Sequence, residues 1–336
     1  TANLTRRAGA EVCRQVGEHA RPVAQVAREY GVCWWTVQHA VTEHGTPLVD
    51  DPGRVGTVRK LGVDETSYRS ATPTSHTRYV TGLVDLDRVA MIDLVEGNNA
   101  KALRDWCEGA DPDWLARIRV VATDLANSYR AGLSPHLDHA RRVADPFHVC
   151  RVGSRCVDRV RRRVQNEQLG HRGRRGDPLF GIRKLLLVGD ERLNDRGRER
   201  MLEGLRAGDP HDEVVGAWLA KEHIRDLYLA DSYNEMRSLL AMTIRRCQAD
   251  EVPEIRSVGD TLASWRSEIL ANWSTGASNG PTEGLNRLVK DVKRCGRGFR
   301  NFEHYRTRVL LHAGKPTWPQ RPAPPRVRTP HPQLCA

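Results

Sequence analysis

The region between residues 60 and 144 limits what this chain can fold into more than any other feature. Three short segments, 60–68, 77–86 and 88–95, are rich in Val, Leu, Ile and Tyr and are separated by polar turns. This texture predicts a meander of antiparallel strands. A helical stretch, a mostly apolar strand ending at Asp124, a second helix and a short fifth strand follow. Because helices lie between the later strands, we expect a mixed sheet with helices on both faces.

This order of strands and helices is that of a ribonuclease-H-like sheet. From residue 168 to residue 273 the strands stop, and amphipathic segments separated by Gly, Asp and Pro predict an all-helical insertion. A further helix is expected near Pro281, which fits the first turn of a helix, with Asn279 as its cap. The predicted fold class is therefore α/β, a ribonuclease-H-like mixed sheet with an all-helical insertion, preceded by an N-terminal helix-turn-helix.

The N-terminal helix-turn-helix is predicted within residues 10–45. Ala27 is small where two helices would cross, and Gly31 follows four positions later, where a turn needs a permissive backbone. The apolar contacts between the two helices would come from Val26, Val32 and Val37. The exposed side of the second helix would carry the DNA-contacting residues Trp35, Thr36, Gln38 and His39. An ordinary helical hairpin with a tryptophan in its core is the alternative.

These patterns divide the chain into six expected segments. They are the helix-turn-helix, a linker, the first part of the catalytic core, the helical insertion, the closing helix of the core, and a disordered proline-rich tail. The expected bounds are, in the same order, 1–45, 46–59, 60–167, 168–273, 274–312 and 313–336.

The formal net charge is +11 and the pI about 9.5, and only seven of the 53 basic residues are lysine. A chain this basic is drawn to polyanions, chiefly nucleic acid, and arginine forks suit phosphate oxygens. A GC-rich genome would also encode an arginine-heavy chain, so the charge alone does not decide. The arginine-dense segment 159–175 is expected to be disordered without its partner. Within it, Arg162 and Arg163 are candidate DNA contacts.

Other function classes are excluded by composition. No segment approaches the roughly 18 consecutive apolar residues of a membrane helix. Charges interrupt the N-terminal residues before any apolar run develops, so no secretory signal is expected. The eight cysteines contain no CxxC pair, which argues against a zinc ribbon or finger. A soluble intracellular protein with reduced thiols is expected.

Two carboxylates lie where a metal site would be expected. Asp64 follows apolar Leu61 and Val63 in the first strand, and Asp124 ends the fourth. In a ribonuclease-H-like sheet these strands are neighbours, so the two carboxylates would share one cleft and repel unless a cation lay between them. Mg²⁺ takes oxygen ligands and keeps positions open for a substrate phosphate. Taken singly, each aspartate has an ordinary explanation, because strand ends are rich in Asp.

Four stretches of the sequence resemble a known family. LGVDE, VVATDLANSYRAGL, ADPFHV and SNGPTEGLNRLVKDVKRCGRGFRNF look like the motifs of the ISL-three-type insertion-sequence transposases, a bacterial family with a ribonuclease-H-like DDE catalytic domain. The similarity runs from about Lys60 to His312 and also covers the predicted helix-turn-helix before it. By this resemblance the three metal-binding acids are Asp64, Asp124 and Glu283.

The resemblance also implies cofactors and partners. Two ions of Mg²⁺ or Mn²⁺ would drive strand cleavage and strand transfer, and the partner would be double-stranded DNA, both the terminal repeats of the element and its target. A homo-oligomer on DNA, in the bacterial cytoplasm and associated with the nucleoid, is expected. Asp145 and His148 match an acid-x-x-His pair of related transposases and have either a supporting role or a buried structural one. On or just past the closing helix, backbone phosphates would be contacted by Lys290, Lys293, Arg294 and Arg297.

Two rival functions remain open from sequence alone. The first is a DNA-binding regulator whose second domain is a catalytically inactive remnant and needs no divalent ion. The second is a nuclease of the same fold that cleaves but does not join. A serine or tyrosine recombinase has no support in the arrangement of residues.

Overall fold

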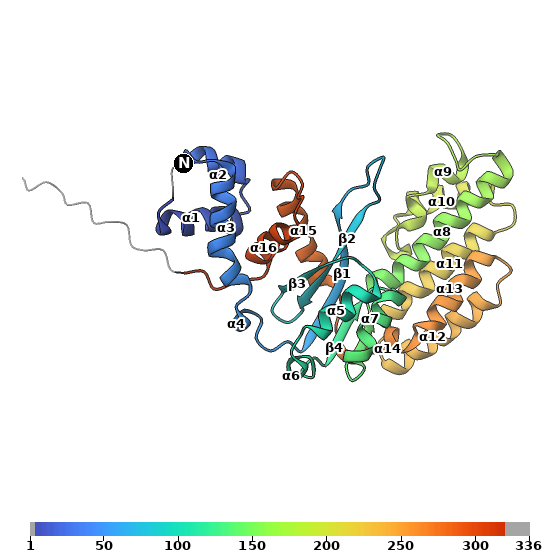
Figure 1. Ribbon diagram of the computed structural model, residues 1–336. Helices are drawn as coiled ribbons and strands as arrows, with labels where there is room; N and C mark the ends of the chain where they lie inside the picture. The colour runs from blue at the N-terminus through green and yellow to red at the C-terminus, as the bar shows by residue number, and fades with distance from the viewer. Residues whose placement is uncertain (1–3, 320–336) are drawn as a thin grey trace, which may run out of the picture.

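The computed structural model describes residues 4–319, and they form three regions in a row (Figure 1). N-terminal helices lie at one end, a mixed sheet lies in the middle, and a large set of helices lies at the other end. The last two helices of the described chain, drawn in red, lie between the N-terminal helices and the sheet. The C-terminal helices therefore lie against regions that are far from them in sequence.

The sheet has five strands in the order β3-β2-β1-β4-β5. β2 pairs antiparallel with both β1 and β3, whereas β4 runs parallel to β1 and to β5. The predicted five-stranded mixed sheet is thus confirmed. The strand bounds are β1 Lys60–Arg69, β2 Arg78–Asp85, β3 Ala90–Glu96, β4 Val120–Thr123 and β5 Arg141–Ala144.

Alternate residues of the central strands serve two separate cores, because successive side chains of a strand point to opposite faces. Leu61, Val63 and Val121 pack with the helices α5 (Ala100–Glu108) and α7 (Asn127–Leu137). On the opposite face, the apolar cluster contains the following residues: Val84, Ala122, Val289 and Val309. The last two belong to α15 (Gly280–Cys295) and α16 (Phe302–Ala313). Helices on both faces bury the middle of the sheet.

The N-terminal region contains α1 (Arg6–Gly17), α2 (Val23–Glu29) and α3 (Trp34–Val49). Val26 and Val37 are fully buried, and Val32 is partly buried against the same cluster. Gly31 has φ +63° in the turn between α2 and α3, the left-handed conformation that glycine tolerates best. Two helices and a connecting turn therefore occur where the sequence predicts them.

Two sequence expectations for this region are wrong. Gln38 was expected on the exposed side of α3, but it is 4% exposed, because it lies beside Val37 on the face that packs against the other helices. Segment 46–59 was expected to be a linker without helical periodicity. Instead α3 continues through Pro47 to Val49, and α4 (Pro52–Val55) follows after the cap residue Asp51.

The helical insertion has an apolar core of its own. It begins within α8 (Pro146–Leu169), a continuous helix that leaves the sheet and enters the insertion, so no boundary separates residues 167 and 168. The arginine-dense segment is helical as far as Leu169 rather than disordered. The remaining helices are α9 (Pro178–Ile182), α10 (Asp195–Gly208), α11 (Glu213–Asp226), α12 (Tyr233–Gln248), α13 (Pro253–Ser264) and α14 (Arg266–Thr275), with short 3₁₀ turns at 185–187, 190–192 and 227–229. A further short helix, α6 (Pro112–Leu115), precedes β4.

Arg54 joins the N-terminal helices to the sheet and to α16. Its side chain is 7% exposed, and its guanidinium donates hydrogen bonds to four carbonyl oxygens. These belong to Val49 at the end of α3, Met91 and Ile92 of β3, and Gly314 after α16. The N-terminal helices and one face of the sheet also share a single apolar cluster. The expected tail, 313–336, lies mostly outside the described residues.

Candidate active site

The site begins with two aspartates on adjacent parallel strands. Val63 of β1 is in register with Thr123 of β4, so the next residues, Asp64 and Asp124, lie side by side. Both are half-buried. Because Leu61, Val63 and Val121 face α5 and α7, the intervening positions, including the two aspartates, face α15. The strand pairing therefore brings two carboxylates that are 60 residues apart in sequence into one place.

His148 completes a group of possible metal ligands. One ligand atom from each of Asp64, Asp124 and His148 lies within 4.8 Å of the others. His148 belongs to the first turn of α8, which starts directly after β5, and Asp145 caps that helix by accepting from the His148 backbone N–H. The Asp145 carboxylate also lies 3.1 Å from His148 Nδ1. A proton on Nδ1 would satisfy that bond and leave Nε2 with a free lone pair for a metal ion.

The helix α15 docks on the same edge through polar residues of its first two turns. Asn279 Nδ2 donates to the Val63 carbonyl, and its backbone N–H donates to Asp145 Oδ1. Thr282 is fully buried and donates to Asn279 Oδ1. A Cβ at Gly62 would collide with the side-chain oxygens of both residues, so glycine is required for this close approach.

Asn286, one turn further along α15, contacts the metal-ligand group directly. Its Nδ2 donates to Asp64 Oδ2 at 2.7 Å. Sequence reasoning assigned no role to Asn286 or Thr282, and it gave Asn279 only the role of a helix cap, although the Asn279 side chain makes no capping hydrogen bond. The signal was present, since the spacing Asn279, Glu283, Asn286 places three polar residues along one helix face.

Glu283 shares this helix face but is exposed and does not belong to the group of close ligand atoms. In the described part of the chain, the structure thus groups the two predicted aspartates with His148 and holds Glu283 one turn from Asn286.

The electrostatics of the site favour a cation. Burial raises the pKa of Asp124 to about 6; the charge of His148 opposes this shift, and the nearby charges of Asp64, Glu65 and Asp145 add to it. Burial likewise raises the pKa of Asp64. Burial would also raise the pKa of Asp145, but hydrogen bonds from His148 and from the Asn279 backbone lower it below its ordinary value. Although burial opposes it, the hydrogen bond to Asp145 and the nearby aspartates raise the pKa of His148.

Two oxygen atoms at this position lack a hydrogen-bond partner although they are buried. They are Asp124 Oδ1 and Asn286 Oδ1. Buried polar atoms are nearly always paired, so two unpaired acceptors beside two carboxylates fit the donor set of a hard divalent cation. The residues present therefore suit a divalent metal ion.

The predicted DNA contacts on α3 have different exposures. Trp35 is 70% exposed, and His39 is exposed beside Glu43. Thr36 is half-buried, with its hydroxyl 3.1 Å from Cys33 Sγ. Gln38 is buried, as described above.

The basic residues on α15 and just after its end at Cys295 also separate into two kinds. Lys290, Arg294 and Arg297 are exposed, and Arg294 pairs with Asp291. Lys293 instead donates to the backbone oxygen and hydroxyl of Ser67, which fixes it against β1, and burial lowers its pKa.

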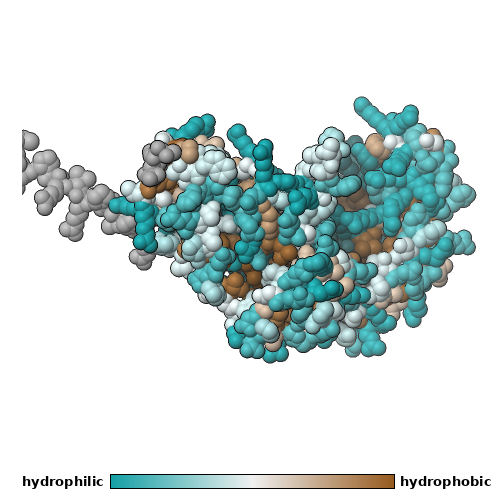
Figure 2. Space-filling model, viewed as in Figure 1, coloured by the Kyte–Doolittle hydropathy of each residue, from teal (hydrophilic) through white to brown (hydrophobic). Residues whose placement is uncertain are grey.

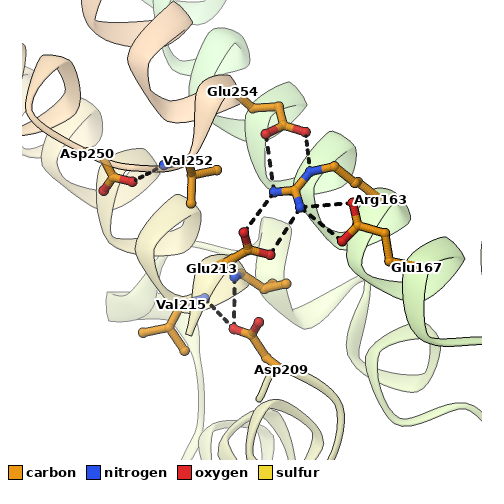
Figure 3. A network of polar contacts seen from close by, with 9 residues as sticks. Arg163, Glu167, Asp209, Glu213, Val215, Asp250, Val252 and Glu254 are labelled. Carbon is orange, nitrogen blue, oxygen red and sulfur yellow. Dashed lines mark hydrogen bonds and ion pairs between the residues drawn. The ribbon is translucent and has the colours of Figure 1, made fainter. Parts of the chain in front are cut away.

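Arg163 has an internal role rather than a surface one. Its guanidinium pairs with carboxylates of Glu167, Glu213 and Glu254, and so links α8 to α11 and α13 (Figure 3). These hydrogen bonds, chiefly those to Glu254, raise its pKa further. Arg162, in contrast, is half-exposed and pairs with Asp158. Because three acids already occupy the donors of Arg163, we do not retain it as a DNA contact.

Comparison with known proteins places the chain in a family. The family model of the ISL3-type DDE transposases, described as transposase, matches residues 61–309, well over half of the chain. The chain belongs to this family. It is thus a DDE transposase, a metal-dependent polynucleotidyl transferase, which confirms the resemblance found in the sequence.

Individual relatives agree with the family. The chain is 25% identical over 318 residues to the transposase for insertion sequence element IS1557 of Mycobacterium tuberculosis (strain CDC 1551 / Oshkosh), covering 88% of this chain and 70% of the relative. It is 24% identical over 297 residues, with the same coverage, to the transposase for insertion sequence element IS1001 of Bordetella parapertussis. A solved Drosophila P element transposase strand transfer complex aligns with a TM-score of 0.46 and 10% identity, over 93% of this chain and 92% of that one. Within residues 4–319, no helix is both long and apolar enough to span a bilayer.

Proposed function

We propose that this transposase cuts DNA at the ends of its own insertion sequence and joins those ends to target DNA, with Asp64, Asp124 and Glu283 as the acids that hold the metal ions. The observation that carries this proposal is the group formed by Asp64, Asp124 and His148 within 4.8 Å. Burial raises the pKa of both carboxylates on these neighbouring strands, and a cation that binds between them stabilises their charged form.

The assignment of Glu283 rests on the docking of α15. Asn279 and Asn286 flank Glu283 on one helix face, and both contact β1 at or next to Asp64. Because the Glu283 side chain is long and exposed, we propose that a change of rotamer brings its carboxylate to the same edge. His148, held by Asp145, is a further ligand or a proton donor to the reacting phosphate.

The chemistry is two successive phosphoryl transfers at one site. Bound Mg²⁺ or Mn²⁺, two ions in the proposed state, would activate the attacking oxygen and stabilise the charge that develops on phosphorus and the leaving oxygen. Asp64, Asp124 and Glu283 supply the oxygen ligands, and Asn286 orients Asp64 through its hydrogen bond. In cleavage, water attacks phosphorus and the bond to the 3′-oxygen breaks, which leaves a 3′-hydroxyl. In strand transfer, that 3′-hydroxyl attacks a phosphodiester of the target and displaces a second 3′-oxygen.

Two exposed faces are proposed to contact DNA. On α3, exposed residues recur at intervals of four and three positions, at Trp35, His39 and Thr42, on the face opposite buried Val37 and Val41. This face would enter a groove as the second helix of a helix-turn-helix. On α15, the exposed basic residues are Arg287, Lys290 and Arg294, and Arg297 follows just after the helix ends at Cys295. These side chains suit backbone phosphates.

The finer architecture is part of the same proposal. The strand order and the covering helices support a ribonuclease-H-like core, interrupted by the helical insertion before its closing helix. Two element ends must be brought together for joining, so the active form is proposed to be a homo-oligomer on DNA, associated with the bacterial nucleoid.

The proposal is tested by metal-dependent cleavage and joining of a supercoiled plasmid that carries two element ends. Asp64→Asn, Asp124→Asn and Glu283→Gln are expected to abolish both steps while binding of end DNA stays within about threefold of the parent protein. Glu108→Gln serves as the matched control, because Glu108 is an exposed acid at the end of α5. Full activity in Glu283→Gln together with none in His148→Ala would replace Glu283 by His148 as third ligand.

Two other outcomes would favour the rival functions. Linear products without joining would indicate a nuclease. Tight end binding with no divalent-ion dependence of any reaction would indicate a regulator.

A further inference from the structure

Phe147 is a large apolar side chain left in solvent at the edge of the metal-ligand group. It is 55% exposed, although it lies between Pro146 and His148 on the first turn of α8. Its ring is 5.4 Å from the imidazole of His148, centroid to centroid, at 82°. His148 is itself one of the three close ligand residues. An aromatic ring therefore stands one residue away from the proposed reacting centre.

The packing of α8 does not account for this ring. The buried positions of α8 that begin its apolar stripe are Val149, Gly153, Cys156, Val157 and Val160. They follow the helical spacing of a single face, and Gly153 lets α11 approach closely at Lys221. Phe147 lies two residues before Val149, about 200° away around the helix, and so points off this stripe. The ring contributes little to the insertion core.

The surroundings are open enough for a substrate. Figure 2 shows that the molecular surface is hollowed between the sheet and the helical insertion, with hydrophobic residues visible in the hollow. The start of α8 connects these two regions. A nucleic-acid strand whose phosphate lies at Asp64 and Asp124 would place a flanking base within reach of the first turn of α8.

We infer that Phe147 stacks on a nucleobase next to the phosphate that reacts, and so positions the DNA strand for cleavage and joining. This inference rests on the proposed function. A phenyl ring has no hydrogen-bonding group, so it offers its π-face to any base and does not read sequence. Stacking would hold a base that leaves the duplex stack when the backbone bends toward the metal ions. The ligand class is a single unpaired or partly unstacked base of the element end.

The test uses the full chain and a duplex of the element end joined to flanking DNA, with 2-aminopurine beside the scissile phosphate. In EDTA, where no cleavage occurs, binding of the parent protein is expected to change the 2-aminopurine fluorescence, and Phe147→Ala is expected to lose that change. With Mg²⁺, Phe147→Ala should cleave about 10- to 100-fold more slowly, which matches the usual energy of one stacked base. Phe147→Tyr should keep both properties, whereas Phe147→Leu should lose them.

Two controls separate this inference from the proposed function. Leu229→Ala removes a 69% exposed apolar side chain of the insertion and should change neither readout. Asp124→Asn should abolish cleavage but retain the fluorescence change. If Asp124→Asn cleaves normally, the proposed function fails, whatever the fluorescence shows.

Three results would overturn the role of Phe147 alone. The first is a cleavage rate of Phe147→Ala equal to that of the parent protein. The second is equal cleavage rates of Phe147→Leu and Phe147→Tyr, which would mean that the size of the side chain matters rather than its aromatic face. The third comes from a substrate abasic at the stacked position. On it, the parent and Phe147→Ala should cleave at the same rate, and a difference that persists would point to contact with a second copy of the chain instead.

Discussion

Asn286 donates a 2.7 Å hydrogen bond to Asp64, and this contact joins two segments that lie 222 residues apart in the chain. Between them the chain builds the rest of the sheet and the whole helical insertion. The bond orients one oxygen of Asp64 and leaves Asn286 Oδ1 unpaired beside it. The closing helix α15 therefore contributes Asn286 to the site in addition to Glu283, the acid that the family motif assigns to it.

Asn286→Ala is expected to weaken metal-dependent cleavage by roughly 10- to 100-fold, the usual effect of removing a residue that orients a metal ligand. The affected quantity should be the Mg²⁺ concentration at half-maximal activity. Asn286→Asp should lower that concentration instead, because it adds a carboxylate beside Asp64. If Asn286→Ala requires the same Mg²⁺ concentration as the parent protein, the hydrogen bond from Asn286 to Asp64 has only a structural role.

The raised pKa of Asp124 predicts how stability changes with pH in the absence of metal. The folded-state pKa of Asp124 is about 6, against 3.8 for an ordinary aspartate side chain, so the folded protein holds the proton more tightly. Asp124 therefore costs no stability below about pH 3.8, and its cost grows until the pH passes 6. Asp124→Asn should stabilise the metal-free protein at pH 7.5 by at most about 3 kcal/mol and have little effect at pH 4.

Thermal unfolding in EDTA across this pH range measures the difference. Mg²⁺ at pH 7.5 should then raise the melting temperature of the parent protein and not that of Asp124→Asn. A constant difference between the two proteins from pH 4 to pH 7.5 would contradict the raised pKa.

Arg163→Ala is expected to destabilise the protein by roughly 1–3 kcal/mol, since it leaves Glu167, Glu213 and Glu254 close together without their common cation. Arg162→Ala, at a half-exposed position on the same helix, should cost under about 1 kcal/mol. Chemical denaturation compares the two. Similar losses of stability in both variants would show that the ion-pair network in Figure 3 stabilises the fold no more than the single ion pair of Arg162 does.

Substitution of Lys290 and Arg297 by alanine should weaken binding of end DNA and of unrelated DNA to a similar extent. Each lost phosphate contact is expected to reduce the slope of log K against log salt by about 0.9. Arg117→Ala removes an exposed arginine far from α15 in sequence and serves as control. An unaltered slope in the double variant would remove this face from the DNA interface.

Local sequence patterns predicted much of the fold. The apolar segments of β1 and β4 predict two strands that end or pass through an aspartate, and the parallel pairing of these strands is enough to bring Asp64 and Asp124 together. Gly31 marks its turn because few other residues adopt a positive φ there.

What the sequence could not give depends on contacts between distant segments. The orientation of α3 is set by its packing against α1 and α16, so the burial of Gln38 cannot be predicted from the sequence of α3 alone. Arg163 looks like a surface cation until α11 and α13 bring two of its glutamates beside it. Asn286 looks like an ordinary helix residue until α15 lies on β1.

Arg54 has one more consequence. By tying the end of α3 to β3 and to the residue after α16, it prevents the N-terminal helices from swinging as a separate module. A duplex bound by α3 would reach the metal-ligand group at a fixed distance from its contact with α3. The protein would therefore cut at a fixed number of base pairs from the bound sequence. The fold would then determine the distance between the α3 contact and the cleavage position. Base pairs inserted between the two would move the cleavage position in the sequence, because no flexible linker could compensate for them.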